Sequence, residues 1–251
     1  MPRSNHTIKI EIRGWGDLPP SLLYKFLSSN QREDKALLRL FIGILRHHKV
    51  PVKKLEREYI SELFLAVDWS FLKEYPLDPL IPSSLGYHFG EAKMRTATAL
   101  EYQLAEHYYH KYIKDWKLHD LRCMFFTVAR PLASKAEYLT TEDKRTRLIS
   151  QSQVEDLAKT GPKIDNAVLS AAFYYVYGNL MHISNLNKKI LTGGSGASDG
   201  LGWISTFMSI AEANIFGNLD SVYNTNIHNI FAFMLKKQVE NAEIEKRMKR
   251  K

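Results

Sequence analysis

The sequence predicts a mainly α-helical protein of about eight or nine helices, with one short β-strand near its N-terminus. Apolar residues recur every three or four positions through most of the chain, which is the spacing of one helix face. Cap residues and prolines mark the ends of several of these segments. With 45% hydrophobic and 25% charged residues among 251, the composition is that of a globular protein with a substantial core.

Residues 1–75 are predicted to hold the strand and three helices. Residues 7–13 alternate apolar and polar side chains, which is typical of a half-buried strand, and such a strand needs a partner elsewhere in the chain or in another protomer. A short helix follows Pro20. Asn30, followed three positions later by a glutamate, predicts the start of a second helix that ends near His48. A third helix is expected from Val52 to about Tyr75.

Residues 76–90, PLDPLIPSSLGYHFG, carry three of the nine prolines and are predicted to lack a continuous helix. The stretch is either a linker between an N-terminal lobe and a C-terminal lobe of residues 91–251, or a long surface loop within one domain. The sequence alone leaves both interpretations open.

Residues 91–251 are predicted to be helical around two strongly apolar segments. The expected helices run from Glu91 to about Trp116, from Leu118 to Ala129, through residues 140–161 with a Thr cap and acids at the start and Gly161 at the end, and from Leu219 to the C-terminus. Between the last two, an apolar helix precedes a glycine-rich loop, and a second apolar helix follows it. A helix that is apolar on most of its circumference belongs in the middle of a lobe.

The glycine-rich loop, residues 192–202, contains the sequence GGSGASDG. Backbone N–H groups before a helix could bind an anion there, but a phosphate-binding P-loop would require Gly-Lys-Ser/Thr, and a dinucleotide fingerprint would require a preceding strand. A flexible connection between two core helices is the simpler interpretation.

Residues that could carry catalysis are scattered. Glu91-Ala92-Lys93, with Gln103 and Tyr108 downstream, resembles the metal-binding pattern of restriction-like endonucleases, which would also need Asp78 as a carboxylate and a strand where a helix start is predicted. Glu106, His107 and His110 lack a third ligand at a recognised spacing, which favours surface histidines. We therefore predict no catalytic residue, no metal ligand and no cofactor, and the protein is more readily interpreted as a non-enzyme.

Cys123 is the single cysteine and lies in an apolar stretch, which excludes an internal disulfide and predicts a buried, inert thiol. The N-terminus has no apolar signal segment, and no apolar run is long enough to cross a membrane. We expect an intracellular protein, located in the cytoplasm, or within a virion if the source is viral.

Basic residues give the clearest functional indication. The formal net charge is +8 and the pI is about 9.3, which favours a polyanionic partner. Separate basic clusters could line one groove that follows a phosphate backbone, with Tyr108, Tyr109, Tyr174 and Tyr177 as stacking faces. Each cluster alone is more often a solvated surface, and each tyrosine is more often part of the core. The candidate phosphate-contacting residues are Arg46, His47, Lys49, Lys53, Lys54, Arg57, Lys144, Arg145, Arg147, Lys188, Lys189, Lys236 and Lys237.

Three functions follow from these observations. The first is a structural nucleic-acid-binding protein, a nucleoprotein or coat-like packaging protein, that binds RNA or single-stranded DNA without strong sequence specificity and contacts neighbouring protomers through its N-terminal strand and C-terminal helix. The second is a helical matrix or scaffold protein whose basic faces bind an anionic membrane or a protein partner. The third is a helical enzyme, a metal-dependent nuclease included.

Overall fold

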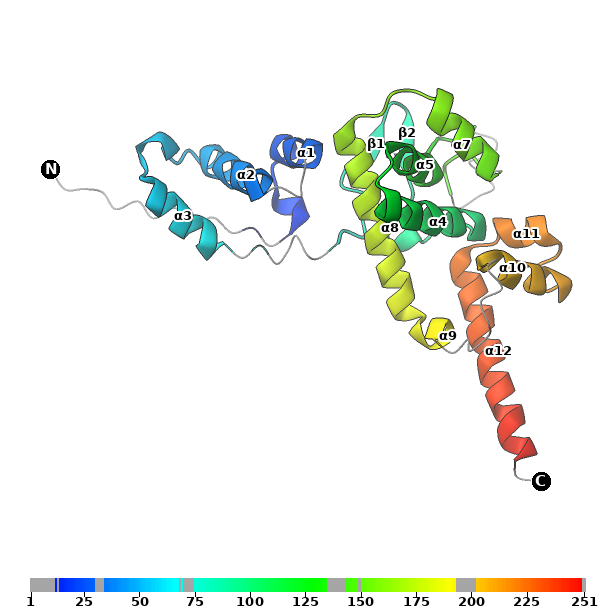
Figure 1. Ribbon diagram of the computed structural model, residues 1–251. Coiled ribbons are helices and arrows are strands. Elements are labelled where there is room, and N and C mark those ends of the chain that lie inside the picture. Colours follow the sequence, from blue (N-terminus) through cyan, green and yellow to red (C-terminus); the bar gives the residue numbers. More distant parts are fainter. Residues whose placement is uncertain are drawn as a thin grey trace.

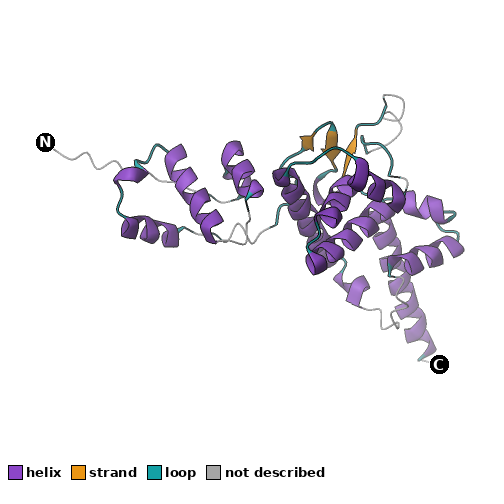
Figure 2. Cartoon of the chain, turned by 45° about the horizontal axis from the view of Figure 1, so that its top comes forward, coloured by secondary structure: helices purple, strands orange, loops and turns teal. Residues whose placement is uncertain are grey.

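The computed structural model describes residues 12, 14–29, 34–67, 69, 75–134, 143–148, 150–192 and 202–249. These residues contain eleven α-helices and a small three-stranded sheet, which confirms the predicted mainly α fold. Figure 1 shows two parts, which we name the N-terminal arm (residues 14–69) and the body (residues 75–249). Figure 2 shows the same division and the position of the sheet within the body.

The N-terminal arm is built from three helices and two short 3-10 turns. A cluster that includes Trp15, Leu27 and Ile44 buries its apolar residues and reaches the body at Ala167 and Ala171. The elements are η1 (Trp15–Asp17), α1 (Pro20–Ser28), α2 (Asp34–His47), η2 (Val52–Lys54) and α3 (Arg57–Ala66).

The third predicted helix is shorter than expected. It begins at Arg57, after η2, and ends at Ala66. The chain turns back at this end, and the Trp69 indole N–H donates to the Phe64 carbonyl at 3.1 Å, which occupies one of the last acceptors of the helix. Of the predicted strand only Ile12 is described, and it has no regular structure; the Asn30 cap also lies outside the described residues.

The proline-rich stretch is part of the body. Strands β1 (Ser83–Ser84) and β2 (Tyr87–Phe89) form a hairpin, and β2 pairs antiparallel with β3 (Ala129–Pro131). Leu85 and Gly86, both with positive φ, make the two-residue turn. The prolines do exclude a helix, as predicted, but strands of two and three residues are too short to show alternation in the sequence.

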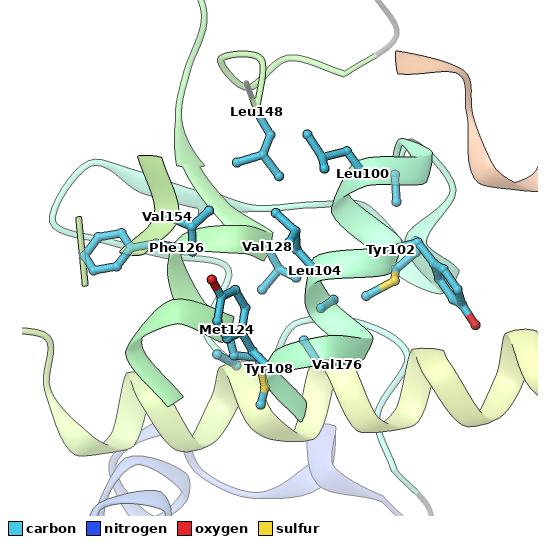
Figure 3. Close-up of a cluster of buried hydrophobic side chains, with 14 of the residues drawn as sticks. Leu100, Tyr102, Leu104, Tyr108, Met124, Phe126, Val128, Leu148, Val154 and Val176 are labelled. Atoms are coloured by element: carbon cyan, nitrogen blue, oxygen red, sulfur yellow. The ribbon is translucent and has the colours of Figure 1, made fainter. Parts of the chain in front are cut away.

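Helix α8 runs through the centre of the molecule and packs against α1, α4 and α5 (Figure 1). This agrees with the prediction that the apolar helix before the glycine-rich loop is central. Figure 3 shows the core that α4, α5 and α8 enclose, in which Tyr108, Phe126 and Val176 are buried. Cys123 is also fully buried, and burial raises the pKa of its thiol to about 12, as expected for an inert cysteine. The helical elements of the body are η4 (Ala92–Met94), α4 (Ala99–Asp115), α5 (Leu118–Val128), α7 (Gln151–Thr160), α8 (Asn166–Leu186), α9 (Lys188–Thr192), α10 (Trp203–Glu212), α11 (Leu219–Asn224) and α12 (Ile227–Met248).

Three predicted helix boundaries in the body are wrong. The helix expected from Thr140 begins at Gln151, because the Ser150 hydroxyl accepts from the Gln153 N–H at 3.2 Å and caps it there, while Arg145 bridges to Leu132. The helix expected from Glu91 begins at Ala99, because the Thr98 hydroxyl accepts from the Glu101 N–H at 3.2 Å and caps it there. The helix expected from Leu219 is divided at Asn226, which caps α12 and also bridges to Thr98. Among the described residues, no helix combines the length and apolarity needed to cross a bilayer.

Candidate nucleic-acid interface

The first basic cluster forms the far end of the arm, which we name the cationic tip (residues 46–57). Helix α2 ends at His47, the chain reverses through Lys49 in a left-handed conformation (φ 60°), and α3 begins at Arg57 (Figure 1). This reversal gathers cations from three elements on one turn. The predicted members, Arg46, His47, Lys49, Lys53, Lys54 and Arg57, are all exposed.

The second cationic surface joins two predicted clusters and is named the lysine patch: Lys188, Lys189, Lys236 and Lys237. Helix α9 packs against α12, and the Gln238 side-chain amide donates to the Lys189 carbonyl at 3.2 Å. All four lysines are exposed. The Glu240 carboxylate lies 3.8 Å from the Lys236 ammonium and 2.8 Å from that of Lys237, so four cations share this region with that carboxylate.

The third predicted cluster does not form a cationic surface. Arg145 is only 5% exposed, and its guanidinium is bonded to Glu101 and Asp143, so the phosphate-contacting role predicted for it is incompatible with its burial. Arg147 is exposed and donates through Nε to the Asn224 side-chain oxygen. Lys144 is exposed, with its carbonyl held by the Ala133 N–H at 2.8 Å.

Arg145 belongs to a buried ion cluster of two carboxylates and two guanidiniums: Glu101, Arg130, Asp143 and Arg145. Arg145 Nη1 lies 3.0 Å from Glu101 Oε1, and Arg145 Nη2 lies 2.7 Å from Asp143 Oδ2. Arg130 Nη2 lies 2.6 Å from Glu101 Oε2 and 3.0 Å from Asp143 Oδ2. The charges balance, and the cluster fastens residues 143–148 and β3 to α4.

Electrostatics inside this cluster favour the charged forms of Asp143 and Arg145. Burial opposes ionisation of Asp143, but hydrogen bonds and charges from Arg145 and Arg130 outweigh it and lower the pKa of the carboxyl. Burial likewise disfavours charged Arg145, yet Glu101 and Asp143 raise the pKa of its guanidinium. The sequence predicts Arg145 to lie on the surface because the polar run TTEDKRTR contains no sign of a carboxylate 44 residues upstream.

The four tyrosines predicted to offer stacking faces divide into two groups. Tyr108 is buried in the core and points its hydroxyl at the Glu155 carboxylate, 3.2 Å away, so it offers no face to a ligand. Tyr109, Tyr174 and Tyr177 are partly exposed. Tyr109 and Tyr177 lie nearly parallel, with centroids 5.3 Å apart and planes 13° apart.

The alternative metal sites do not assemble. Glu91 follows β2 and pairs with the exposed Arg95, while Lys93 lies in η4 with a positive φ, so the motif is not on a strand. The Glu106 carboxylate instead accepts a hydrogen bond from the Trp203 indole at 2.6 Å. Among the described residues, no group of three or more His, Cys, Asp or Glu side chains could hold a metal ion.

The predicted glycine-rich loop and the terminal basic residues 250–251 lie outside the described residues, apart from the ends of the loop at 192 and 202. Comparison of the chain with protein-family models, with curated proteins and with solved structures gave no significant match. The surface geometry is therefore the basis for assigning a function.

Proposed function

We propose that this protein binds the phosphate backbone of a nucleic acid, RNA or single-stranded DNA, through the lysine patch and the cationic tip, without strong sequence specificity. The observation that carries the proposal is the packing of α9 on α12, which brings Lys188 and Lys189 beside Lys236 and Lys237. Two clusters separated by nearly fifty residues in sequence become one exposed surface.

The chemistry of both surfaces supports phosphate binding. Lysine is a compact, flexible point charge, suited to phosphate contacts that carry no base information. In the cationic tip, residues 46–57 contain five Lys or Arg residues and two His, against the single carboxylate of Glu56. Such an excess of charge attracts a polyanion and releases its counterions on binding.

A structural role in packaging is an extension of this proposal, because it requires a second protomer. The predicted contact through the C-terminal helix has a candidate surface: α12 projects from the body (Figure 1), and its side chains are almost all exposed from Leu235 onward. Val239, Ile244 and Met248 are apolar members of that surface. The predicted contact through the N-terminal strand lies outside the described residues.

Fluorescence anisotropy tests the phosphate contacts. Labelled RNA and DNA strands of about 20 nucleotides are titrated with protein between roughly 50 and 200 mM NaCl. We expect affinity to fall steeply with salt. The variant Lys188→Gln/Lys189→Gln/Lys236→Gln/Lys237→Gln is expected to bind more weakly and to have a shallower salt slope, by about 0.7 for each phosphate of a single strand that is no longer neutralised.

The matched control is Lys159→Gln/Lys163→Gln, which removes two exposed lysines at the end of α7 and in the turn after it. It changes net charge without touching either cationic surface, so its salt slope should match that of the unmodified protein. An affinity that does not change with salt would contradict the proposal, and so would binding to anionic vesicles in the absence of binding to either strand.

A further inference from the structure

A connected set of aromatic side chains lies where α4, α8 and the chain entering the body meet, and we name it the aromatic row. Its rings come from three segments but contact each other without a break. Trp116 lies 5.1 Å from Tyr112, Tyr112 5.7 Å from Phe173, and Tyr177 4.0 Å from Tyr75, measured between centroids. The row consists of Tyr75, Tyr109, Tyr112, Trp116, Phe173 and Tyr177.

Three central rings share one orientation. The planes of Tyr109, Phe173 and Tyr177 differ by 13°, 16° and 28°, and their centroids are 5.3, 6.2 and 5.9 Å apart. Three rings stacked in one column would place the outer two about twice as far apart as neighbours, so these rings form a triangle instead. At these distances nearly parallel rings cannot lie side by side in one plane, so each is offset-stacked on its neighbours, and the faces that remain uncovered are the ones on which a flat ligand could stack.

The two ends of the row are open to solvent. Trp116 is 47% exposed and Tyr75 is 37% exposed, and the four rings between them are partly exposed. Large aromatic rings at the surface that contact one another are typical of a binding surface. Tyr109, Tyr112 and Phe173 also pack against the core of the body, so the row is an outer layer of that core whose two end rings are open to solvent.

Glycine within α8 makes this arrangement possible. A Cβ at Gly178 would lie 2.5 Å from the Pro76 carbonyl oxygen and 3.1 Å from the Tyr75 Cβ, so only glycine lets the chain cross the helix at this point. The Asn179 side-chain amide donates to the Leu77 carbonyl at 3.0 Å and holds the crossing in place. Tyr75 is thereby fixed beside Tyr177, against which its ring packs edge to face.

The charge around the row suits an anionic ligand that carries flat rings. Helix α8 contains neither Asp nor Glu from Asn166 to Leu186. His110 and Lys114 are exposed on α4, and the His110 ring lies 5.3 Å from that of Tyr109. Burial raises the pKa of Tyr109 to about 12, so its hydroxyl stays uncharged at neutral pH. Leu186, the last residue of α8, lies about 14 Å along the helix from Tyr177 at 1.5 Å per residue, and the lysine patch begins two residues later at Lys188.

The row also holds a strained residue. Trp116 caps α4 in the left-handed conformation, with φ 55° and ψ 31°, a position at which glycine is the usual residue. A bulky residue in this region costs about 1–3 kcal/mol and is found most often at functional sites. The strain accompanies the most exposed ring of the row.

From these observations we infer that the aromatic row is a stacking platform for unpaired bases of a single-stranded nucleic acid. The inference rests on the proposed function, because the lysine patch would hold the phosphates of the same strand. Every base has a flat face, so stacking accepts any sequence, whereas the bases of a duplex are hidden in its interior. The site is therefore specific for the single-stranded form.

The test compares a mixed-sequence DNA strand of about 20 nucleotides with the same strand annealed to its complement. We expect the unmodified protein to bind the single strand more tightly than the duplex. Trp116→Leu and Tyr109→Leu should each weaken binding of the single strand roughly tenfold, which is the effect of removing one stacked ring, and leave the salt slope unchanged.

The matched control is Tyr24→Leu, which removes a tyrosine that is 42% exposed on α1, away from the row. Circular dichroism verifies that each variant is folded, and Trp116→Leu alters an exposed ring, so the test does not depend on a core substitution. Equal binding of single strand and duplex, or normal binding by both leucine variants, would overturn the stacking platform. If binding were still salt-dependent, the proposed function would stand without it. Absence of salt-dependent binding to either DNA would overturn both.

Discussion

The arm and the body are held together in different ways. The body has a continuous core that includes α4, α5, α8 and α12, with the buried ion cluster at its edge. The arm has a smaller cluster that reaches the body at Ala167, Ala171 and Tyr174 of α8 and at Leu80 and Ile81. Beyond it, α3 is fastened to α2 through the edge-to-face contact of Phe41 and Phe64, 5.6 Å apart. Leu65 of α3 is 80% exposed.

This difference predicts that the arm opens with a smaller free energy than the body does. Regions with few buried contacts open with a smaller free energy than the core does. The arm should therefore open locally while the body stays folded, and the cationic tip should be carried by the less stable part. Phosphate contacts at the tip would then order the arm, whereas the lysine patch and the aromatic row stand on the body.

The largest expected effect comes from breaking the buried ion cluster. Arg145→Ala leaves Glu101 and Asp143 with fewer cationic partners inside the body, which should lower the free energy of unfolding by about 3–5 kcal/mol. Urea unfolding followed by circular dichroism measures it. Arg95→Ala is the control, because its pair with Glu91 is exposed and is worth less than about 1 kcal/mol. Equal effects of the two variants would show that the cluster does not stabilise the body.

Trp15→Ala should separate the arm from the body. The Trp15 ring is buried and lies 5.1 Å from the Tyr174 ring of α8, and loss of a buried tryptophan removes about 3 kcal/mol of packing. We expect faster proteolysis and amide exchange in residues 14–67, with the unfolding midpoint of the body unchanged. If the unfolding midpoint of the body also fell in this variant, the arm and the body would not differ in stability as predicted.

Gly178→Ala tests the close crossing of the chain at Tyr75 and Pro76 over helix α8. The new Cβ would meet the Pro76 carbonyl, which should cost about 1–2 kcal/mol, although alanine favours the helix itself. Amide exchange near Leu77 should rise, and the stacking contribution of Tyr75 should fall. Ser170→Ala, a small change elsewhere in α8, is the control. Unchanged exchange at Leu77 would show that the crossing can shift without loss.

The smallest effect concerns pH and is confined to the body. Burial raises the pKa of Glu106 above 4.5, and the hydrogen bond from Trp203 offsets only part of this. Below pH 4.5 the carboxyl is protonated in both states, and stability is lost as pH rises through the higher folded pKa. Glu106→Gln should therefore gain less than about 1 kcal/mol over the unmodified protein at about pH 7 and nothing at about pH 4. Urea unfolding of both proteins between about pH 4 and pH 7 measures this gain. A gain that is independent of pH would contradict a raised pKa of Glu106 as its cause.

The sequence predicts the fold class because long helices repeat their apolar positions many times. Helix α7, for example, has the predicted terminal Gly161, and α5 begins at the predicted Leu118. The hairpin at Leu85–Gly86 escapes prediction because its strands are shorter than one period of a recognisable pattern. Asn226 escapes prediction as a helix boundary because the residue that it meets, Thr98, is far away in the chain.

The sequence identified most of the individual residues of the candidate site, but it did not predict which of them come together on one surface. Lys188 and Lys236 were identified from charge alone, but their proximity depends on how α9 meets α12. Trp116 was predicted only as the approximate end of a helix, since an aromatic residue at helical spacing looks the same whether its face is buried or exposed. Arg145 was predicted to be exposed but is buried, because a cation in a polar run gives no sign of burial.

In the proposed stacking platform, the left-handed backbone of Trp116 would place stability and ligand binding in opposition at a single residue. Glycine at this helix end would relieve the strain and stabilise α4, but it would also remove the ring at the open end of the aromatic row. Selection for stability alone would favour glycine here. A tryptophan at this position is what a trade-off with function would retain, as strained residues at binding sites commonly are.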